Sequence, residues 1–200
     1  MGMYIPHDMI SHIGKIFQGE YNIGYNKQSP IILDIGANVG GFAVWASYRW
    51  PNAQIHCYEP VANTFNLLKI NTEYNKNILI YNVAVGKQDG KRFIFYGKNN
   101  IGEASFIKGE EQQDNGEEVS VIAASSLPKA DIVKIDTEGA ETEILSALKI
   151  KPDVFLIEYH SSDNRRIVDN LLKDYVLFEF SMRNYNYGVQ KYINKKLINQ

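Results

Sequence analysis

The chain has 200 residues and a mass of 22.8 kDa, a length that predicts a single domain over residues 1–200. Its hydrophobic share of 44% and charged share of 22% exclude a disordered chain, and its net charge of -2 disfavours nucleic acid as a partner. A lone cysteine excludes an internal disulfide, no apolar stretch reaches the roughly 20 residues of a membrane span, and the N-terminus lacks the pattern of a secretory signal. These features predict a cytoplasmic protein without a membrane span.

Apolar runs typical of buried parallel strands alternate with segments of helical spacing. The N-terminal segment, residues 1–30, is expected to form one helix over residues 7–17 that covers an end of the sheet. Helices are also predicted around residues 42–49, 61–72 and 140–148, and another follows Ser161 and Ser162, which can cap it. Five strands are predicted, at residues 31–35, 54–58, 78–85, 131–135 and 154–159.

Two further segments depart from this alternation. Residues 91–124 carry short strand-like pieces between polar loops, so we expect a small β insertion there. Residues 175–180 and 185–193 flank the turn residues Arg183 and Asn184, which predicts an antiparallel C-terminal hairpin at the sheet edge. Repeated β-α-β units build an open sheet with helices on both faces. The predicted fold is therefore α/β and Rossmann-like, with a mainly parallel seven-stranded sheet.

The loop after the first strand, DIGANVGG at residues 34–41, has the composition of a ligand-binding turn. Ligands of open α/β sheets bind at the carboxyl ends of the strands, and Gly36 and Gly40 let the backbone turn tightly beside a ligand. Asn38 stands where the dinucleotide fingerprint requires glycine. The carboxylate of Asp34 would repel a pyrophosphate and attract a cationic group. The loop resembles motif I of the class I S-adenosylmethionine-dependent methyltransferases, although such a turn can also serve only to connect a strand to a helix.

Residues after the second strand and near the end of the third extend this ligand site. Glu59 follows the glycines by about 20 residues, a spacing at which a carboxylate accepts hydrogen bonds from both hydroxyls of a ribose. The alternative is a solvated acid at a strand end. The residues expected around the cofactor here are Glu59, Pro60, Asn82, Val83 and Ala84.

The segment KIDTEGAE at residues 134–141 places three carboxylates just past the fourth strand, across from the glycine loop. Together with DIGANVGG and the pair Glu59-Pro60, it resembles the FkbM family of methyltransferases over residues 31–159. The resemblance implies a class I methyltransferase fold, S-adenosyl-L-methionine as the cofactor, and O-methylation of a hydroxyl on a sugar, a glycan or a small natural product.

The acids of this segment are the candidate catalytic groups. We expect Asp136 beside the methionine end of the cofactor or the reacting hydroxyl, with Glu138 nearby. Lys134 is expected to neutralise these acids, and Glu141 to be an acid of the first turn of a helix. His160 follows the fifth strand at the same edge and could accept a proton from the hydroxyl, or it could be structural. The predicted catalytic residues are Asp136, Glu138 and His160, and Asp136 is also expected to bind the cofactor.

Several alternatives stay open at this point. With Glu158, the catalytic residues could hold a divalent cation, although no spacing motif requires a metal. A nicotinamide-dependent oxidoreductase would use a similar sheet, but Asn38 and the KIDTEGAE segment disfavour it. A non-catalytic module could keep the fold for cofactor binding or assembly. For an enzyme, the expected partner is a small-molecule or glycan acceptor, in a pocket framed by residues 98–118 and the N-terminal segment.

Overall fold

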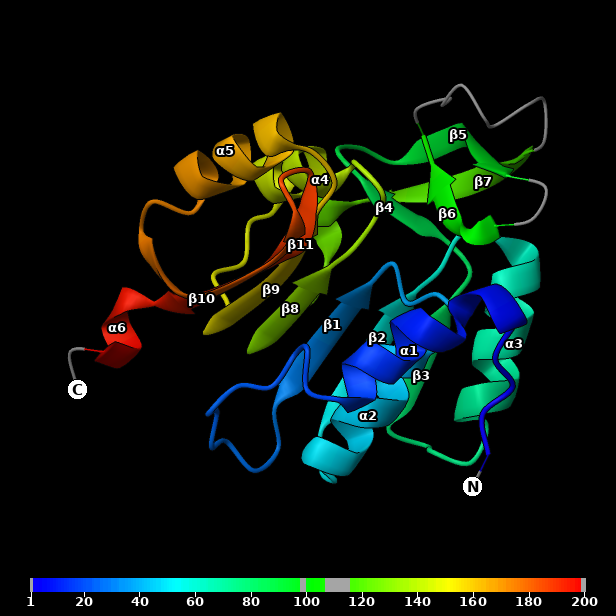
Figure 1. The fold of residues 1–200 in the computed structure, drawn as a ribbon, viewed down its shortest axis with the longest axis horizontal. Coiled ribbons are helices and arrows are strands. Elements are labelled where there is room, and N and C mark those ends of the chain that lie inside the picture. Colours follow the sequence, from blue (N-terminus) through cyan, green and yellow to red (C-terminus); the bar gives the residue numbers. More distant parts are fainter. Residues whose placement is uncertain (1, 98–99, 107–115, 199–200) are drawn as a thin grey trace.

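The computed structural model describes residues 2–97, 100–106 and 116–198 (Figure 1). Its main sheet has seven strands in the order β10-β11-β9-β8-β1-β2-β3. The strands from β9 to β3 pair in parallel, whereas β11 runs antiparallel between β9 and β10. The predicted Rossmann-like α/β sheet with a C-terminal hairpin is confirmed. The strands span Ile31–Ile35 (β1), Gln54–Tyr58 (β2), Ile78–Tyr81 (β3), Ile132–Ile135 (β8), Val154–Tyr159 (β9), Tyr175–Asn184 (β10) and Tyr187–Asn194 (β11).

Helices cover both faces of this sheet because successive side chains of its buried strands point to opposite sides. One core lies under α1, α2 and α3, and a second core lies under α4 and α5 (Figure 1). The helices expected around residues 42–49, 61–72 and 140–148 and after Ser161 are confirmed, whereas the single helix expected over residues 7–17 is a 3-10 turn followed by α1. The hydroxyl of Ser161 caps α5 by accepting a hydrogen bond from the backbone N–H of Asn164 at 2.9 Å. The helices span His7–Met9 (η1, a 3-10 turn), Ile10–Phe17 (α1), Gly41–Arg49 (α2), Ala62–Thr72 (α3), Ala124–Ser126 (η2, also 3-10), Glu141–Ala147 (α4), Ser162–Leu171 (α5) and Lys195–Ile198 (α6).

A second, four-stranded sheet has the order β4-β7-β5-β6 and contains the expected β insertion. The expectation of one strand over residues 78–85 is wrong, because the chain leaves the main sheet after β3 and enters the second sheet at β4. Between them, the side-chain amide of Asn82 donates to the carbonyl oxygens of Glu59 and Pro60, each at 2.9 Å. An apolar run alone does not reveal such a change of sheet. The strands span Ala84–Gly86 (β4), Gly90–Gly97 (β5), Asn100–Ser105 (β6) and Gly116–Ala123 (β7).

The turn of the C-terminal hairpin lies two residues beyond its expected place. β10 continues through Arg183 and Asn184, and residues 185–186 form the turn. The side-chain oxygen of Asn184 accepts hydrogen bonds from the backbone N–H groups of Asn186 and Tyr187, at 2.8 and 3.0 Å. This asparagine-initiated turn keeps Arg183 inside the strand. The side chain of Arg183 points toward the carboxyl ends of the parallel strands.

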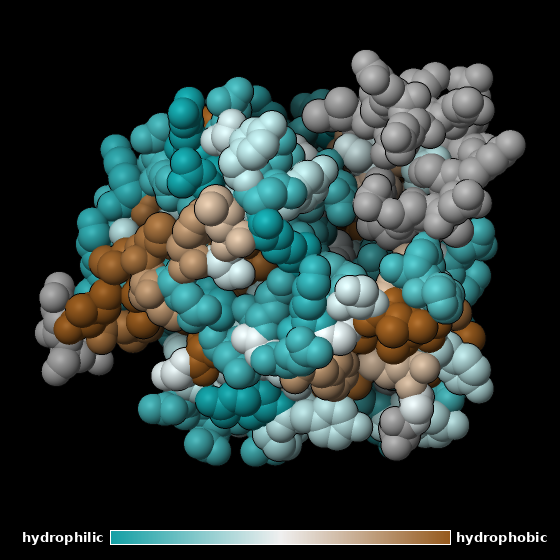
Figure 2. All heavy atoms as spheres, viewed as in Figure 1, coloured by the Kyte–Doolittle hydropathy of each residue, from teal (hydrophilic) through white to brown (hydrophobic). Residues whose placement is uncertain are grey.

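β10 is the edge strand of the main sheet, and four of its large apolar side chains are exposed: Leu177, Phe178, Phe180 and Met182. Figure 2 shows a hydrophobic area on the side of the molecule where β10 and α6 lie, and a second one on the opposite side of the same face. No helix within the described residues is long and apolar enough to cross a membrane.

The loop after β1 packs against the ends of the two neighbouring strands, β2 and β8. The backbone N–H groups of Gly36 and Ala37 both donate to the carbonyl oxygen of Tyr58 at 3.0 Å, which ties the loop to the end of β2. Gly36 has a φ of +77°, and a Cβ there would overlap the carbonyl oxygen of Asp136 at the end of β8. Only glycine fits both the conformation and the space.

We therefore expect Gly36→Ala to destabilise the fold by about 3 kcal/mol or more, since it combines a left-handed φ with a backbone overlap. Gly14→Ala is the matched control, because Gly14 lies within α1 with no atom near its absent side chain. That change should raise stability by up to about 1 kcal/mol. Urea unfolding of both variants checks the pair, and equal stabilities would contradict the expectation.

Candidate active site

A cavity of about 220 Å³ opens at the carboxyl ends of β1, β2, β8 and β9. The second sheet contributes Ala84, Val85 and Ile94 to its wall, and η1 and α1 contribute Asp8, Met9 and His12. Other lining residues follow the strands of the main sheet. They include Gly36, Asn38, Glu59, Asp136, Glu138, Glu158, His160, Arg183 and Tyr187.

Lys134 is the buried charge that joins β1 to β8 below this cavity. Its ammonium lies 3.1 Å from Oδ1 of Asp34 and 3.4 Å from Oδ2 of Asp136, and donates to the carbonyl oxygen of Gly36 at 2.7 Å. Burial acts to lower the pKa of Lys134, but the two carboxylates raise it well above its ordinary value. Lys134 therefore stays charged and neutralises the acids, as expected from the sequence.

Glu59 lies at one end of the cavity and is buried. Its Oε2 accepts a hydrogen bond from the backbone N–H of Asn38, and its Oε1 accepts one from that of Val61, both at 2.9 Å. Burial raises the pKa of Glu59 to about 7, because the two N–H donors compensate only part of the lost hydration. Each carboxylate oxygen keeps a further lone pair for a ligand.

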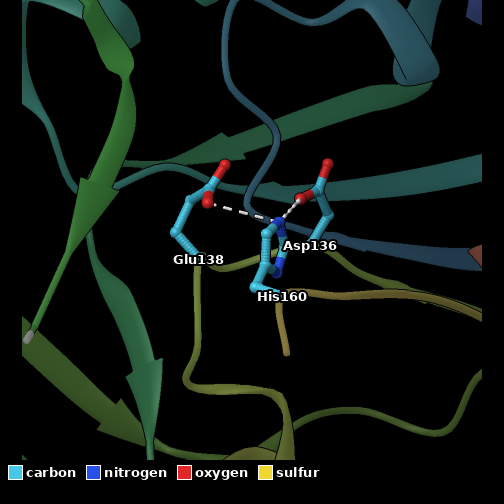
Figure 3. Close-up of side chains that lie close together, drawn as sticks. All are labelled: Asp136, Glu138 and His160. Atoms are coloured by element: carbon cyan, nitrogen blue, oxygen red, sulfur yellow. Dashed lines mark ion pairs between the residues drawn. The ribbon is translucent and has the colours of Figure 1, made fainter. Parts of the chain in front are cut away.

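Asp136, Glu138 and His160 meet at the other end, around one ring nitrogen (Figure 3). Nε2 of His160 lies 3.2 Å from Oε2 of Glu138 and 3.7 Å from Oδ1 of Asp136. Burial alone would lower the pKa of His160, but the hydrogen bond to Glu141 and the charges of Glu138 and Asp136 raise it to about 10. Burial raises the pKa of Glu138 to about 8. The three side chains thus form a tightly coupled group of charges.

Glu141 orients this group from below. It lies in the first turn of α4, as expected, but it is fully buried and its Oε1 accepts hydrogen bonds from Nδ1 of His160 and the backbone N–H of Gly139, both at 3.0 Å. Asn164 of α5 donates to its other oxygen at 2.8 Å. Glu141 is therefore a positioning residue for His160, a role that the sequence pattern did not predict.

Arg183 and Tyr187 of the C-terminal hairpin also reach the cavity, where neither was expected, and so does His12 of the N-terminal segment, which was expected to frame it. Arg183 donates to Oε1 of Glu158 at 2.7 Å and also bonds to Glu20, so it links β10 to β9 and to the segment after α1. The ring of Tyr187 packs edge-on against His160 with centroids 5.6 Å apart. Tertiary contacts bring these residues in, and no local motif marks them.

The cavity brings together most of the residues predicted to form the site. Its wall includes Gly36, Asn38, Glu59, Pro60, Ala84, Asp136, Glu138 and His160. The side chain of Asp34 is fully buried against Lys134 and lies outside this wall, as do Gly40, Asn82 and Val83. Of the expected acceptor frame, His12, Ala104 and Phe106 line the cavity, while residues 98–99 and 107–115 lie outside the described residues.

One donor set within the described residues has metal-ligand geometry. A carboxylate oxygen of Asp136, one of Glu138 and a ring nitrogen of His160 all lie within 4.8 Å of one another. Imidazole and carboxylate are ligands that divalent first-row transition metals accept.

The raised pKa of Glu59 generates a prediction about stability. A carboxyl whose pKa is higher in the folded than in the unfolded chain lowers the stability of the protein as the pH rises between these two pKa values. For Glu59 the two values are 4.5 and about 7. Glu59→Gln removes this titration. We expect the stability of the wild type relative to Glu59→Gln to fall by up to roughly 3 kcal/mol between about pH 4.5 and about pH 7.5. Urea unfolding across this range measures the difference.

The exposed Glu73 supplies the control for that measurement, because Glu73→Gln removes an acid outside the cavity. Its stability should follow that of the wild type at every pH. A difference between wild type and Glu59→Gln that does not change with pH would contradict the prediction.

Comparisons with known proteins agree with this architecture. The methyltransferase FkbM domain model matches residues 34–187. The methyltransferase sdnD of Sordaria araneosa is 22% identical over 196 residues, which covers 77% of this chain and 76% of that protein. Two solved structures share the fold at low identity. The FkbM methyltransferase of Methylobacillus flagellatus KT matches with a TM-score of 0.63 and 14% identity over 88% of this chain.

This chain spans about half the length of that bacterial protein, 47%. The second structure is the fibrillarin of Aeropyrum pernix, solved with natively bound S-adenosyl-L-methionine, which matches with a TM-score of 0.56 and 9% identity over 92% of this chain and 74% of its own. The family model covers more than half of the chain and includes both the turn after β1 and the acids after β8. The chain belongs to the FkbM family of methyltransferases.

Proposed function

We propose that this methyltransferase transfers a methyl group from S-adenosyl-L-methionine to a hydroxyl of a sugar, a glycan or a small natural product. The observation that carries the proposal is a single cavity with two chemically different ends. Asn38 and Glu59 form one end, and Asp136, Glu138 and His160 form the other. Membership of a methyltransferase family disfavours the nicotinamide-dependent oxidoreductase.

The residues at the first end fit the nucleoside of this cofactor. Glu59 is held in place by two backbone N–H groups and keeps lone pairs that can accept hydrogen bonds from the two ribose hydroxyls. Pro60 and Ala84 border the same end, and Asn82 and Val83 shape the chain between β3 and β4. The left-handed turn at Gly36 brings backbone into the wall of the cavity, and Gly40, which packs against Leu68 and Thr72 outside this wall, supports the turn.

The charges of the site fit the methionine part of the cofactor, which carries a sulfonium and an ammonium. Asp136 lines the cavity between the Gly36 turn and His160, and offers a carboxylate to a cationic group. Asp34 acts from behind by holding Lys134, so its effect on the ligand is indirect. When bound, the cofactor supplies an electrophilic methyl group.

The chain's own part in the reaction is to align the acceptor and remove a proton. The cofactor would supply the methyl group and retain on sulfur the electron pair of the broken carbon–sulfur bond, and the cavity would have to hold the acceptor oxygen in line with that bond. The hydroxyl proton must leave as well. Asp136 and Glu138 provide carboxylates for it at the surface of the cavity, and His160 holds these carboxylates in place.

Cofactor binding is the first test of this function. We expect S-adenosylhomocysteine to bind with micromolar affinity, about -8 kcal/mol. Glu59→Ala should weaken binding by roughly 10- to 100-fold, because it removes charge-assisted hydrogen bonds to the ribose. Isothermal titration measures both, with Glu73→Ala as the control that leaves the affinity unchanged. Wild-type affinity in Glu59→Ala would show that Glu59 only closes the turn.

Asp136→Asn tests the catalytic end, because it keeps the shape and removes the charge. We expect single-turnover methyl transfer to fall by about 100-fold. The melting temperature should stay level or rise, since Lys134 keeps Asp34 and the Gly36 carbonyl as partners. The rate is measured with an acceptor found by screening sugars and small hydroxyl compounds. A destabilised variant with an intact rate would show that Asp136 is only a partner of Lys134.

A further inference from the structure

We propose that Asp136, Glu138 and His160 bind one divalent first-row transition-metal cation, which holds the acceptor through its oxygen atoms. The site itself stands on the geometry of these three residues. Its role in holding the acceptor rests on the proposed function.

The distances fit coordination of one ion. Metal–ligand bonds of about 2.1 Å place neighbouring ligand atoms about 3 Å apart and opposite ones about 4 Å apart. Nε2 of His160 lies 3.2 Å from the nearer oxygen of Glu138 and 3.7 Å from that of Asp136 (Figure 3). The ligand atoms of all three residues lie within 4.8 Å of one another. Small side-chain shifts would bring them around a common centre.

The ring of His160 supplies an independent indication. Its side chain is only 7% exposed, and Nε2 faces the cavity between the carboxylates of Glu138 and Asp136, which lie at ion-pair distances of 3.2 and 3.7 Å. Nδ1 is occupied by Glu141 at 3.0 Å. A histidine held at one nitrogen by a buried carboxylate and directed by the other into a cavity is the usual arrangement of a metal-binding histidine.

The charge around His160 favours a cation. Besides Asp136, Glu138 and Glu141, Glu158 is a fourth carboxylate near the ring, with its Oε1 4.0 Å from Nε2. Two cations neighbour this group, but each is shared between two carboxylates. Lys134 lies 3.1 Å from Asp34 and 3.4 Å from Asp136, and Arg183 pairs with both Glu158 and Glu20. A divalent ion would replace the proton on Nε2 as the charge that holds these carboxylates together.

The mixed donor set selects the kind of metal and of acceptor. One imidazole and two carboxylates suit Mn²⁺, Fe²⁺, Co²⁺ or Zn²⁺ better than Ca²⁺ or Mg²⁺, which prefer oxygen ligands alone. Three protein ligands leave positions for two further oxygens. The acceptor class is therefore a compound with adjacent oxygens, such as a vicinal diol or an α-hydroxy carbonyl group, and not an isolated alcohol.

Mn²⁺ is the probe for the first experiment, by isothermal titration and electron paramagnetic resonance on the metal-free protein. We expect one equivalent to bind at micromolar concentration, with Mg²⁺ at least 10-fold weaker. Glu138→Gln should weaken Mn²⁺ binding by at least 10-fold, and Glu73→Gln should not change it. A hyperfine coupling to one imidazole nitrogen should be present in the wild type and absent in His160→Gln. Circular dichroism shows whether each variant is folded.

Failure of binding overturns the inference in either of two ways. The first is no Mn²⁺ binding below millimolar concentration, and the second is binding that Glu138→Gln and Asp136→Asn leave unchanged. S-adenosylhomocysteine affinity, measured after treatment with a chelator, separates this inference from the proposed function. Cofactor binding without Mn²⁺ binding removes the metal site alone, whereas Mn²⁺ binding without cofactor binding supports the metal site and contradicts the methyltransferase proposal.

Discussion

The buried ammonium of Lys134 is the interaction on which the rest of the site depends. It lies between Asp34 at the end of β1 and Asp136 at the end of β8, and it also bonds the carbonyl oxygen of Gly36. Without this cation, two carboxylates would face each other in a region shielded from water, which is strongly unfavourable. The same contact fixes the turn after β1 relative to the acids after β8, and so places the two ends of the cavity at a defined separation.

The two ends of the cavity differ in how their charges are held. Glu59 is held by backbone N–H groups, which are fixed by the fold and cannot move away. Glu138 and His160 are held by other side chains, and Glu138 has a left-handed backbone with a φ of +51°. The position of Glu59 therefore depends on the backbone, whereas the positions of Glu138 and His160 depend on the conformations of several side chains.

Much of the fold could be predicted from the sequence because buried parallel strands form continuous apolar runs. The strands at residues 31–35, 54–58 and 154–159 have the expected bounds for this reason. The prediction failed where a single polar side chain redirects the backbone, as Asn82 and Asn184 do. Predicted residues line the cavity where they follow strands in short motifs, whereas Arg183 and Tyr187 were missed because they reach the cavity through packing between distant segments.

The ion pairs of Arg183 constrain the order in which parts of the protein can fold during synthesis. Glu20 and Arg183 are separated by 163 positions, so α1 and its neighbouring segment lack this anchor until β10 has been synthesised. Contacts of such long sequence separation form late and slowly. During translation, the strands around Lys134 can pair before the hairpin leaves the ribosome, but the wall that includes His12 and Arg183 cannot close. A nascent chain should therefore complete the end of the cavity at Glu59 before the wall that includes Arg183.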